Sequence, residues 1–197
     1  MQRLAPRTAV PTAALAFLLA AVGVEVIFFV MLGPLLPHYA ATLHLGTTGA
    51  GVLSGSYAFG CGLAALPAGL LVARRGAQRV TIAGLVLVGA ACLAFALGSD
   101  VYALDAARLA QGVGGAAVWA GAISWLFGLG DATGRGRLLG LAFSAAGVGA
   151  CLGPALGAVG SAVGTRGVFI ALAGAILALA GLGAALARRP LPASSPS

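Results

Sequence analysis

The stretch TAALAFLLAAVGVEVIFFVMLG, residues 12–33, decides the fold class of this chain. Its only charged residue is Glu25. A helical apolar segment of about 20 residues is long enough to cross the hydrocarbon core of a bilayer. A helix is required because every backbone N–H and C=O group must be paired inside lipid. We therefore predict a transmembrane helix over residues 12–36, ended by Pro34 and Pro37.

Further apolar runs of the same kind follow at residues 49–73, 80–97, 101–127, 138–163 and 168–187. The chain is 60% hydrophobic and 8% charged, whereas soluble domains carry about 25% charged residues. The runs are too long and too uniformly apolar for barrel strands, which alternate with a period of two. We predict an all-α integral membrane domain of six transmembrane helices over residues 1–189, followed by a disordered tail at 190–197.

The arginines predict how the helices cross the membrane. Nine of the eleven fall where six crossings would place a single side: Arg3, Arg7, Arg74, Arg75, Arg79, Arg135, Arg137, Arg188 and Arg189. The opposite side holds only Arg166. Because basic residues concentrate on the cytoplasmic side, we expect both termini in the cytoplasm and a multi-pass protein of the cell's inner (plasma) membrane. With these arginines at membrane edges, no basic face remains, and nucleic acid is not an expected partner.

Three ionisable residues lie inside the predicted spans, where such groups are costly and mark function. Glu25 is near the middle of the first span, and is expected to face a cavity or to stay protonated. It is the first candidate for coupling to protons or for binding a cationic substrate; the alternative is a protonated Glu25 hydrogen-bonded to a neighbouring helix. In the fourth span, Asp105 precedes Arg108 by one helical turn and could pair with it. The alternative is that Arg108 lies shallow and extends to water.

Glycines recur at helical spacing in two of the runs. Gly51, Gly55, Gly62 and Gly69 form a stripe on the second predicted span, and Gly149, Gly153 and Gly157 form one on the fifth. Small residues let helix backbones approach closely in lipid. We therefore expect both stripes to pack against other helices. Tyr57 is interpreted as a lining or interface residue.

The loop after the second span resembles a signature of the major facilitator superfamily. Gly69, Arg74, Gly76 and Arg79 match the pattern Gly-x-x-x-Asp-Arg-x-Gly-x-Arg/Lys-Arg/Lys, with Ala73 in the place of the usual Asp. In that family the acid helps to latch the cytoplasmic face against the other half of the protein. The alternative interpretation is a basic turn that only sets topology.

Two further motifs carry the same resemblance, which covers nearly the whole chain. Arg108-Leu-Ala-Gln111-Gly112 is similar to the family's Arg-x-x-Gln-Gly motif, which is linked there to proton coupling. The run from Gly149 through Gly153 and Pro154 to Gly157 resembles the antiporter motif Gly-x-x-x-Gly-Pro-x-x-Gly of efflux members. Proline within the glycine repeat can bend the helix.

The resemblance implies the N-terminal six-helix half of a transporter, with spans one to three and four to six as inverted repeats. It implies proton-coupled efflux of a small drug-like molecule or metabolite, in the manner of a drug:proton antiporter, with a proton gradient as the energy source and no bound cofactor. The expected partners are the lipid bilayer, a small-molecule substrate, and either a missing C-terminal half or a second copy in a homodimer.

One alternative function remains open, a membrane scaffold or regulatory subunit that does not transport; the missing acid at Ala73 favours it. We do not expect an enzyme, because the sequence shows no catalytic set. We do not expect a metal site either, since His38 and His44 have no cysteine or acid nearby.

Overall fold

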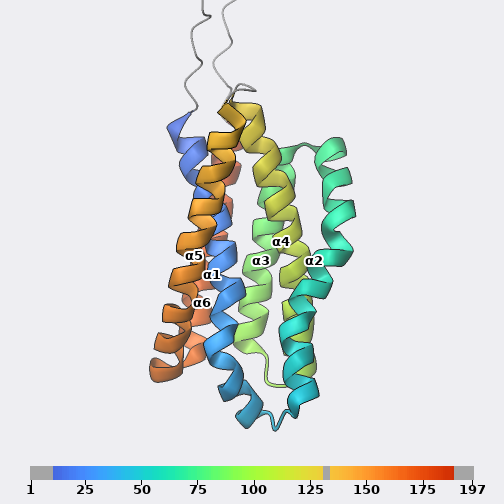
Figure 1. The fold of residues 1–197 in the computed structure, drawn as a ribbon, viewed down its shortest axis with the longest axis vertical. Coiled ribbons are helices and arrows are strands. Elements are labelled where there is room, and N and C mark those ends of the chain that lie inside the picture. Colours follow the sequence, from blue (N-terminus) through green and yellow to red (C-terminus); the bar gives the residue numbers. More distant parts are fainter. Residues whose placement is uncertain (1–10, 131–133, 189–197) are drawn as a thin grey trace, which may run out of the picture.

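The computed structural model describes residues 11–130 and 134–188, and these form six α-helices (Figure 1). The helices are α1 (Thr12–Thr42), α2 (Thr47–Arg75), α3 (Ala77–Leu97), α4 (Val101–Leu129), α5 (Arg135–Val163) and α6 (Thr165–Ala187). Each is long and apolar enough to cross a membrane. The predicted all-helical, six-span fold is confirmed. The predicted tail at 190–197, and Arg3, Arg7 and Arg189, lie outside the described residues.

The predicted end of the first span is wrong, because α1 continues through Pro34 and Pro37 as far as Thr42. Each proline removes one N–H donor, but a helix still pairs the remaining backbone groups within its own segment, as a span in lipid requires. Pro67 and Pro154 lie inside α2 and α5 in the same way. The other helices extend beyond the predicted runs by two or three residues at one or both ends.

Two helix boundaries have a clear local cause, the end of α2 at Gly76 and the start of α4 at Asp100. Gly76 has φ 87° between α2 and α3, a conformation that glycine adopts without a steric penalty. The turn can therefore be as short as one residue. Asp100 begins α4, and its side chain accepts a hydrogen bond of 3.0 Å from the Ala103 N–H. Such a cap satisfies one of the free donors at the start of a helix.

Two of the main helix contacts follow the predicted inverted repeat. Helix α4 packs mainly on α2 and α3, α1 packs on α5, and α3 packs on α6. If α1–α3 are exchanged with α4–α6, the α2–α4 contact becomes the α5–α1 contact and the α3–α6 contact stays in place. The extensive α3–α4 contact does not follow this relation, because its counterpart between α6 and α1 is slight. Figure 1 shows that α1 and α4 run in opposite directions. This is the relation that inverted-topology repeats in transporters have.

The glycine stripe on α5 packs against α1, as expected. A Cβ atom added to Gly149 would lie 2.5 Å from the carbonyl oxygen of Gly23, and one added to Gly157 would lie 2.6 Å from that of Met31. Gly153 would meet Ile27 and the side chain of Val30. The absence of side chains at these three glycines therefore lets the two backbones touch.

The stripe on α2 packs on no other helix among the described residues, unlike the stripe on α5. A Cβ atom added to its four glycines, Gly51, Gly55, Gly62 and Gly69, would meet nothing within 4 Å among the described residues. The glycines that bring α2 and α4 together are Gly60 and Gly112, each facing the backbone of the other helix. Gly60 lies on nearly the opposite side of α2 from Gly62, because two residues turn a helix by about 200°.

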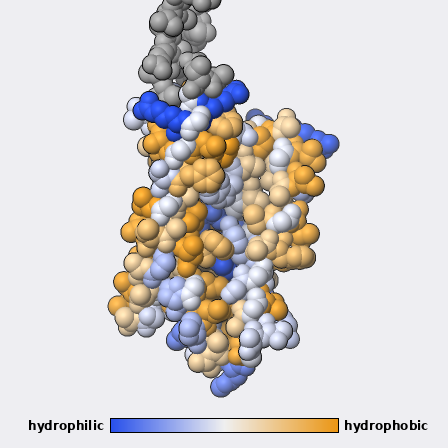
Figure 2. Space-filling model, in the orientation of Figure 1, coloured by the Kyte–Doolittle hydropathy of each residue, from blue (hydrophilic) through white to orange (hydrophobic). Residues whose placement is uncertain are grey.

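Most of the described arginines lie at one end of the bundle, apart from the buried Arg108 and from Arg166 at the opposite end. The α2–α3 connection, the end of α4, the start of α5 and the two ends of the described chain lie together at the top of Figure 1. Arg74, Arg79, Arg135, Arg137 and Arg188 lie at that end and are exposed. Figure 2 shows hydrophilic residues there above a mostly hydrophobic surface. The opposite end is formed by the connections α1–α2, α3–α4 and α5–α6.

Candidate functional site

Glu25 is fully buried in the bundle and is held by two other helices. The hydroxyl of Tyr57 on α2 donates a hydrogen bond of 2.7 Å to Glu25 Oε1. The indole N–H of Trp119 on α4 donates a bond of 3.1 Å to Oε2. Gly115 on α4 makes room for the group, since a Cβ there would lie 2.6 Å from Oε1. Each carboxylate oxygen therefore has its own donor.

Arg108 is also buried, with 2% of its surface exposed. One guanidinium nitrogen, Nη1, donates to Gln111 Oε1, and Nη2 donates to the backbone carbonyl of Phe29 on α1 at 3.3 Å. The guanidinium carbon lies 5.3 Å from the centre of the Tyr57 ring and 5.9 Å from those of Phe28 and Phe29. Aromatic faces stabilise a desolvated cation. The alternative of a shallow Arg108 that extends to water is therefore wrong.

The predicted pair of Asp105 with Arg108 is also wrong. The hydrogen bonds of Arg108 go to Gln111 and Phe29, and the buried Oδ1 atom of Asp105 has no hydrogen-bond partner among the described residues. The side chain of Arg108 extends from α4 toward α1, whereas Asp105 lies at a partly exposed position one turn earlier. Spacing along a helix brings two residues to the same face, but it does not set the direction of a long side chain.

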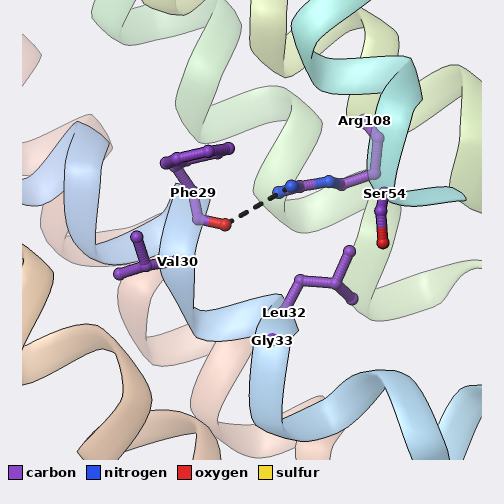
Figure 3. Close-up of a pocket in the computed structure, with 6 residues that line it drawn as sticks. All are labelled: Phe29, Val30, Leu32, Gly33, Ser54 and Arg108. Carbon is purple, nitrogen blue, oxygen red and sulfur yellow. Dashed lines mark hydrogen bonds between the residues drawn. The ribbon is translucent and has the colours of Figure 1, made fainter. Parts of the chain in front are cut away.

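A cavity of about 330 Å³ lies between α1, α2 and α4, next to the guanidinium group. It is lined by Phe29, Val30, Leu32, Gly33, Ser54 and Arg108 (Figure 3). Arg108 is the only charged residue in this lining, and Glu25 does not take part in it. The cavity opens to the surface between α1 and α2, where Phe29, Gly33 and Ser54 are exposed.

Tyr57 connects the two buried charges. Its hydroxyl contacts Glu25, its ring faces the Arg108 guanidinium, and it is stacked on Phe29 with ring centres 4.3 Å apart. Phe29 in turn lines the cavity. Glu25 is therefore connected to the cavity wall through Tyr57 and Phe29.

The molecule is hollowed on the side shown in Figure 2, where paler and bluer residues run between two hydrophobic flanks. Comparison with Figure 1 places this hollow between α5 and α2. Both helices leave large apolar side chains exposed, including Phe59 and Leu66 on α2 and Phe143 and Val148 on α5.

The structure brings together three of the residues that the sequence singles out in two different spans, Glu25, Arg108 and Gln111. The α5 stripe lies next to this cluster, because Gly149 packs on Gly23 and Val26, which flank Glu25 in α1. The loop motif of Gly69, Arg74, Gly76 and Arg79 lies instead at the arginine-rich end of the bundle, and these residues are exposed.

Sequence reasoning missed the two donors to Glu25. Tyr57 is interpreted there as a lining residue and Trp119 is not considered, yet both bond to the carboxylate. The available signal is chemical: an aromatic side chain with a polar atom, deep in a span, needs a hydrogen-bond partner. Glu25 is the one acidic residue in the middle of a predicted span.

Comparison with known proteins places these features in a family. The Major Facilitator Superfamily pattern matches residues 12–197. Among curated proteins, the uncharacterized MFS-type transporter YcaD of Escherichia fergusonii is 33% identical over 126 residues, which cover 64% of this chain and 33% of that protein. Among solved structures, a bacterial homolog to the human lysosomal transporter Spinster is similar in its inward-facing occupied form, with a TM-score of 0.82 at 15% identity over 91% of this chain and 45% of that one.

The inward-facing unoccupied form of the same bacterial homolog has a TM-score of 0.82 over 94% of this chain and 45% of that one. At 15% identity this likeness shows the fold alone. The chain spans about a third of the curated relative, and less than half of the solved ones.

Proposed function

Because the chain belongs to the Major Facilitator Superfamily, we propose that it takes part in proton-coupled transport of a small molecule, with Glu25 as the residue that takes up the proton. The observation that supports this most directly is the buried carboxylate with one donor on each oxygen, from α2 and from α4. A buried ionisable group that joins three helices can link a change of charge to a change in their packing.

The two donors favour one oxygen as the place of the proton. The Trp119 N–H is a donor only, whereas the Tyr57 hydroxyl can donate or accept. A proton on Oε2 would therefore weaken the hydrogen bond from Trp119, because the indole N–H cannot act as its acceptor. A protonated Oε1 can donate a hydrogen bond to the Tyr57 hydroxyl, once that hydroxyl rotates from donor to acceptor. We infer that the proton binds at Oε1, and that Tyr57 reports its arrival to the Arg108 side of the cluster through the ring contact at 5.3 Å.

The direction we propose is efflux. It is supported by the likeness of Gly149, Gly153, Pro154 and Gly157 to the antiporter motif, and by the backbone contact that these glycines make with α1. A proline inside such a contact allows one helix to bend against its neighbour. Movement of α5 on α1 would open or close the side of the bundle next to Glu25, since Gly149 packs beside that residue.

The proposed setting is the cell's inner membrane, with the arginine-rich end in the cytoplasm and both termini there. The exposed arginines at one end support this orientation. We propose that a second six-helix unit covers the hollowed side between α2 and α5. It would be either a C-terminal half or a second copy of this chain, related by an axis along the membrane normal.

Everted membrane vesicles test this function. Respiration makes their interior acidic, and acridine orange reports the pH gradient while a panel of small molecules of different charge is added. At least one compound should dissipate the gradient in vesicles that contain the protein, and Glu25→Gln should abolish this response. Asp100→Asn is the matched control, because Asp100 is an exposed acid at a helix start and asparagine caps a helix equally well.

Equal responses from the protein with Glu25 and from Glu25→Gln would overturn the role of Glu25. The absence of a response to every compound, with the protein folded in the membrane, would favour the alternative of a scaffold or regulatory subunit that does not transport.

A further inference from the structure

Arg108 and Gln111 each keep a buried donor unused. Arg108 Nε and Gln111 Nε2 have no hydrogen-bond partner among the described residues, although the two side chains are 2% and 0% exposed. A buried donor without a partner is destabilising by about 1–3 kcal/mol, and by more when it is charged. Both residues are in the same turn of α4, and Arg108 forms part of the cavity wall. Of the two residues, only Arg108 lines the cavity among the described residues, so its guanidinium is the donor group suited to an acceptor that enters there.

The charges nearby decide which kind of acceptor fits. Arg108 is the only charged residue that lines the cavity, and its guanidinium extends over Leu32 toward the Phe29 carbonyl (Figure 3). The negative charge of the cluster, Glu25, is enclosed by Tyr57 and Trp119 and has no exposed surface. A cationic group in the cavity would thus meet a positive charge first, whereas a carboxylate or phosphate would accept bonds from a guanidinium, for which it is the preferred partner.

The remaining walls select the rest of the ligand. Phe29, Val30 and Leu32 are apolar, and Ser54 provides one hydroxyl at the open edge. The volume of about 330 Å³ holds roughly ten non-hydrogen atoms, since a group of the size of water occupies about 30 Å³. This size is suited to a short alkyl or aryl group with one anionic head.

We propose that the cavity binds amphipathic organic anions, with the anionic head on Arg108, which Gln111 holds by a hydrogen bond, and the apolar part against Phe29, Val30 and Leu32. The proposal rests on the proposed function in one respect, because it takes this cavity to be the substrate site of the transporter. Arg108 keeps its positive charge whether or not Glu25 carries a proton, because guanidinium groups in proteins remain protonated. The anion site is thus available in both states of Glu25.

Calorimetric titration of the protein in nanodiscs of zwitterionic lipid tests the site. Octanoate, octylammonium and octanol share one alkyl chain and differ in the charge of the head, and empty nanodiscs measure their partition into lipid. Octanoate should bind saturably and at least tenfold more tightly than the other two. Equal binding of the three, or tighter binding of octylammonium, would overturn the proposal even if no variant could be prepared.

Two variants remove the anion site in different ways. Arg108→Gln removes the charge, and Gln111→Glu places an opposite charge beside it at almost the same volume. Each should weaken octanoate binding at least tenfold and leave octanol binding unchanged. The control Arg166→Gln removes an exposed arginine outside the cluster, and should leave octanoate binding within twofold. Octanoate binding that survives both changes at the cavity would overturn the proposal.

Two further measurements separate related outcomes. Glu25→Gln should retain octanoate binding while it loses the response to a pH gradient, so a failure of the anion site and a failure of proton coupling are distinguishable. Nanodiscs that contain an anionic phospholipid identify the natural source of the anion. Competition by this lipid would assign the site to a lipid headgroup, and undiminished octanoate affinity would assign it to a free organic anion.

Discussion

At the scale of single residues, the chemistry depends on how Glu25 is enclosed. Tyr57 and Trp119 both donate to it, but only Tyr57 can also accept a bond. The two donors should therefore differ in their effect on coupling. A hydrogen bond to a charged group contributes about 1.5–3 kcal/mol.

We predict that Tyr57→Phe lowers transport driven by a pH gradient about tenfold or more, because the proton on Oε1 loses its acceptor. Trp119→Phe should lower it less, since the indole never needs to change its role. The measurement is the initial rate of fluorescence recovery in energised everted vesicles. A larger loss in Trp119→Phe than in Tyr57→Phe would contradict the assignment of the proton to Oε1.

Gly115 determines the space for the carboxylate. We predict that Gly115→Ala reduces proton-coupled transport about as much as Glu25→Gln does, because the new methyl group would lie 2.6 Å from Glu25 Oε1 and displace it. Gly128→Ala, on the same helix and with nothing within 4 Å of the added Cβ, should leave the rate unchanged. Both variants are compared in the same vesicle assay, after their amounts in the membrane are matched.

At the scale of helices, glycine positions decide which backbones touch. The row on α5 meets α1, whereas the stripe on α2 meets nothing among the described residues. In lipid the apolar tails solvate every face of a helix, so close packing rather than hydrophobicity brings helices together. The two glycine rows should therefore respond differently to added volume.

We predict that Gly153→Val lowers the stability of the bundle by about 1–3 kcal/mol, the usual range for overpacking, because its side chain would overlap Val30 and Ile27. This corresponds to a decrease of several degrees in the midpoint of thermal unfolding in detergent. Gly147→Val, six residues earlier on α5 and with nothing within 4 Å of an added Cβ atom, should shift the midpoint by about a degree or less. Equal shifts would show that the α1–α5 contact does not depend on these glycines.

At the scale of the whole molecule, the arginine-rich end predicts which loops face the cytoplasm. We predict that an impermeant maleimide labels Ser99→Cys in intact cells, and labels Gln78→Cys only after the membrane is opened. The background is a chain in which Cys61, Cys92 and Cys151 are replaced by Ala. Basic loops are retained on the cytoplasmic side, and residues 78 and 99 lie at the two ends of α3. Labelling of Gln78→Cys in intact cells would reverse the orientation and the proposed direction of transport.

Hydrophobicity along the chain determined the class of the fold and the six helices. The positions of the arginines between these helices determined the end of the bundle at which most of them lie. These follow from the sequence because transfer into lipid is a sum over residues within one segment. The same local reasoning singled out Glu25 and Arg108 as ionisable groups in costly positions, whereas Gln111 was singled out by the likeness to a family motif.

The tertiary structure alone decided how each helix is rotated and which groups meet. It directed Arg108 to Gln111 and Phe29 rather than to Asp105, placed Tyr57 and Trp119 on Glu25, and turned Gly60 rather than the predicted stripe toward α4. The physical reason is that a helix apolar on every side has no marked face. Its rotation is set only when small residues of one helix meet the backbone of another, and that contact joins segments far apart in the sequence.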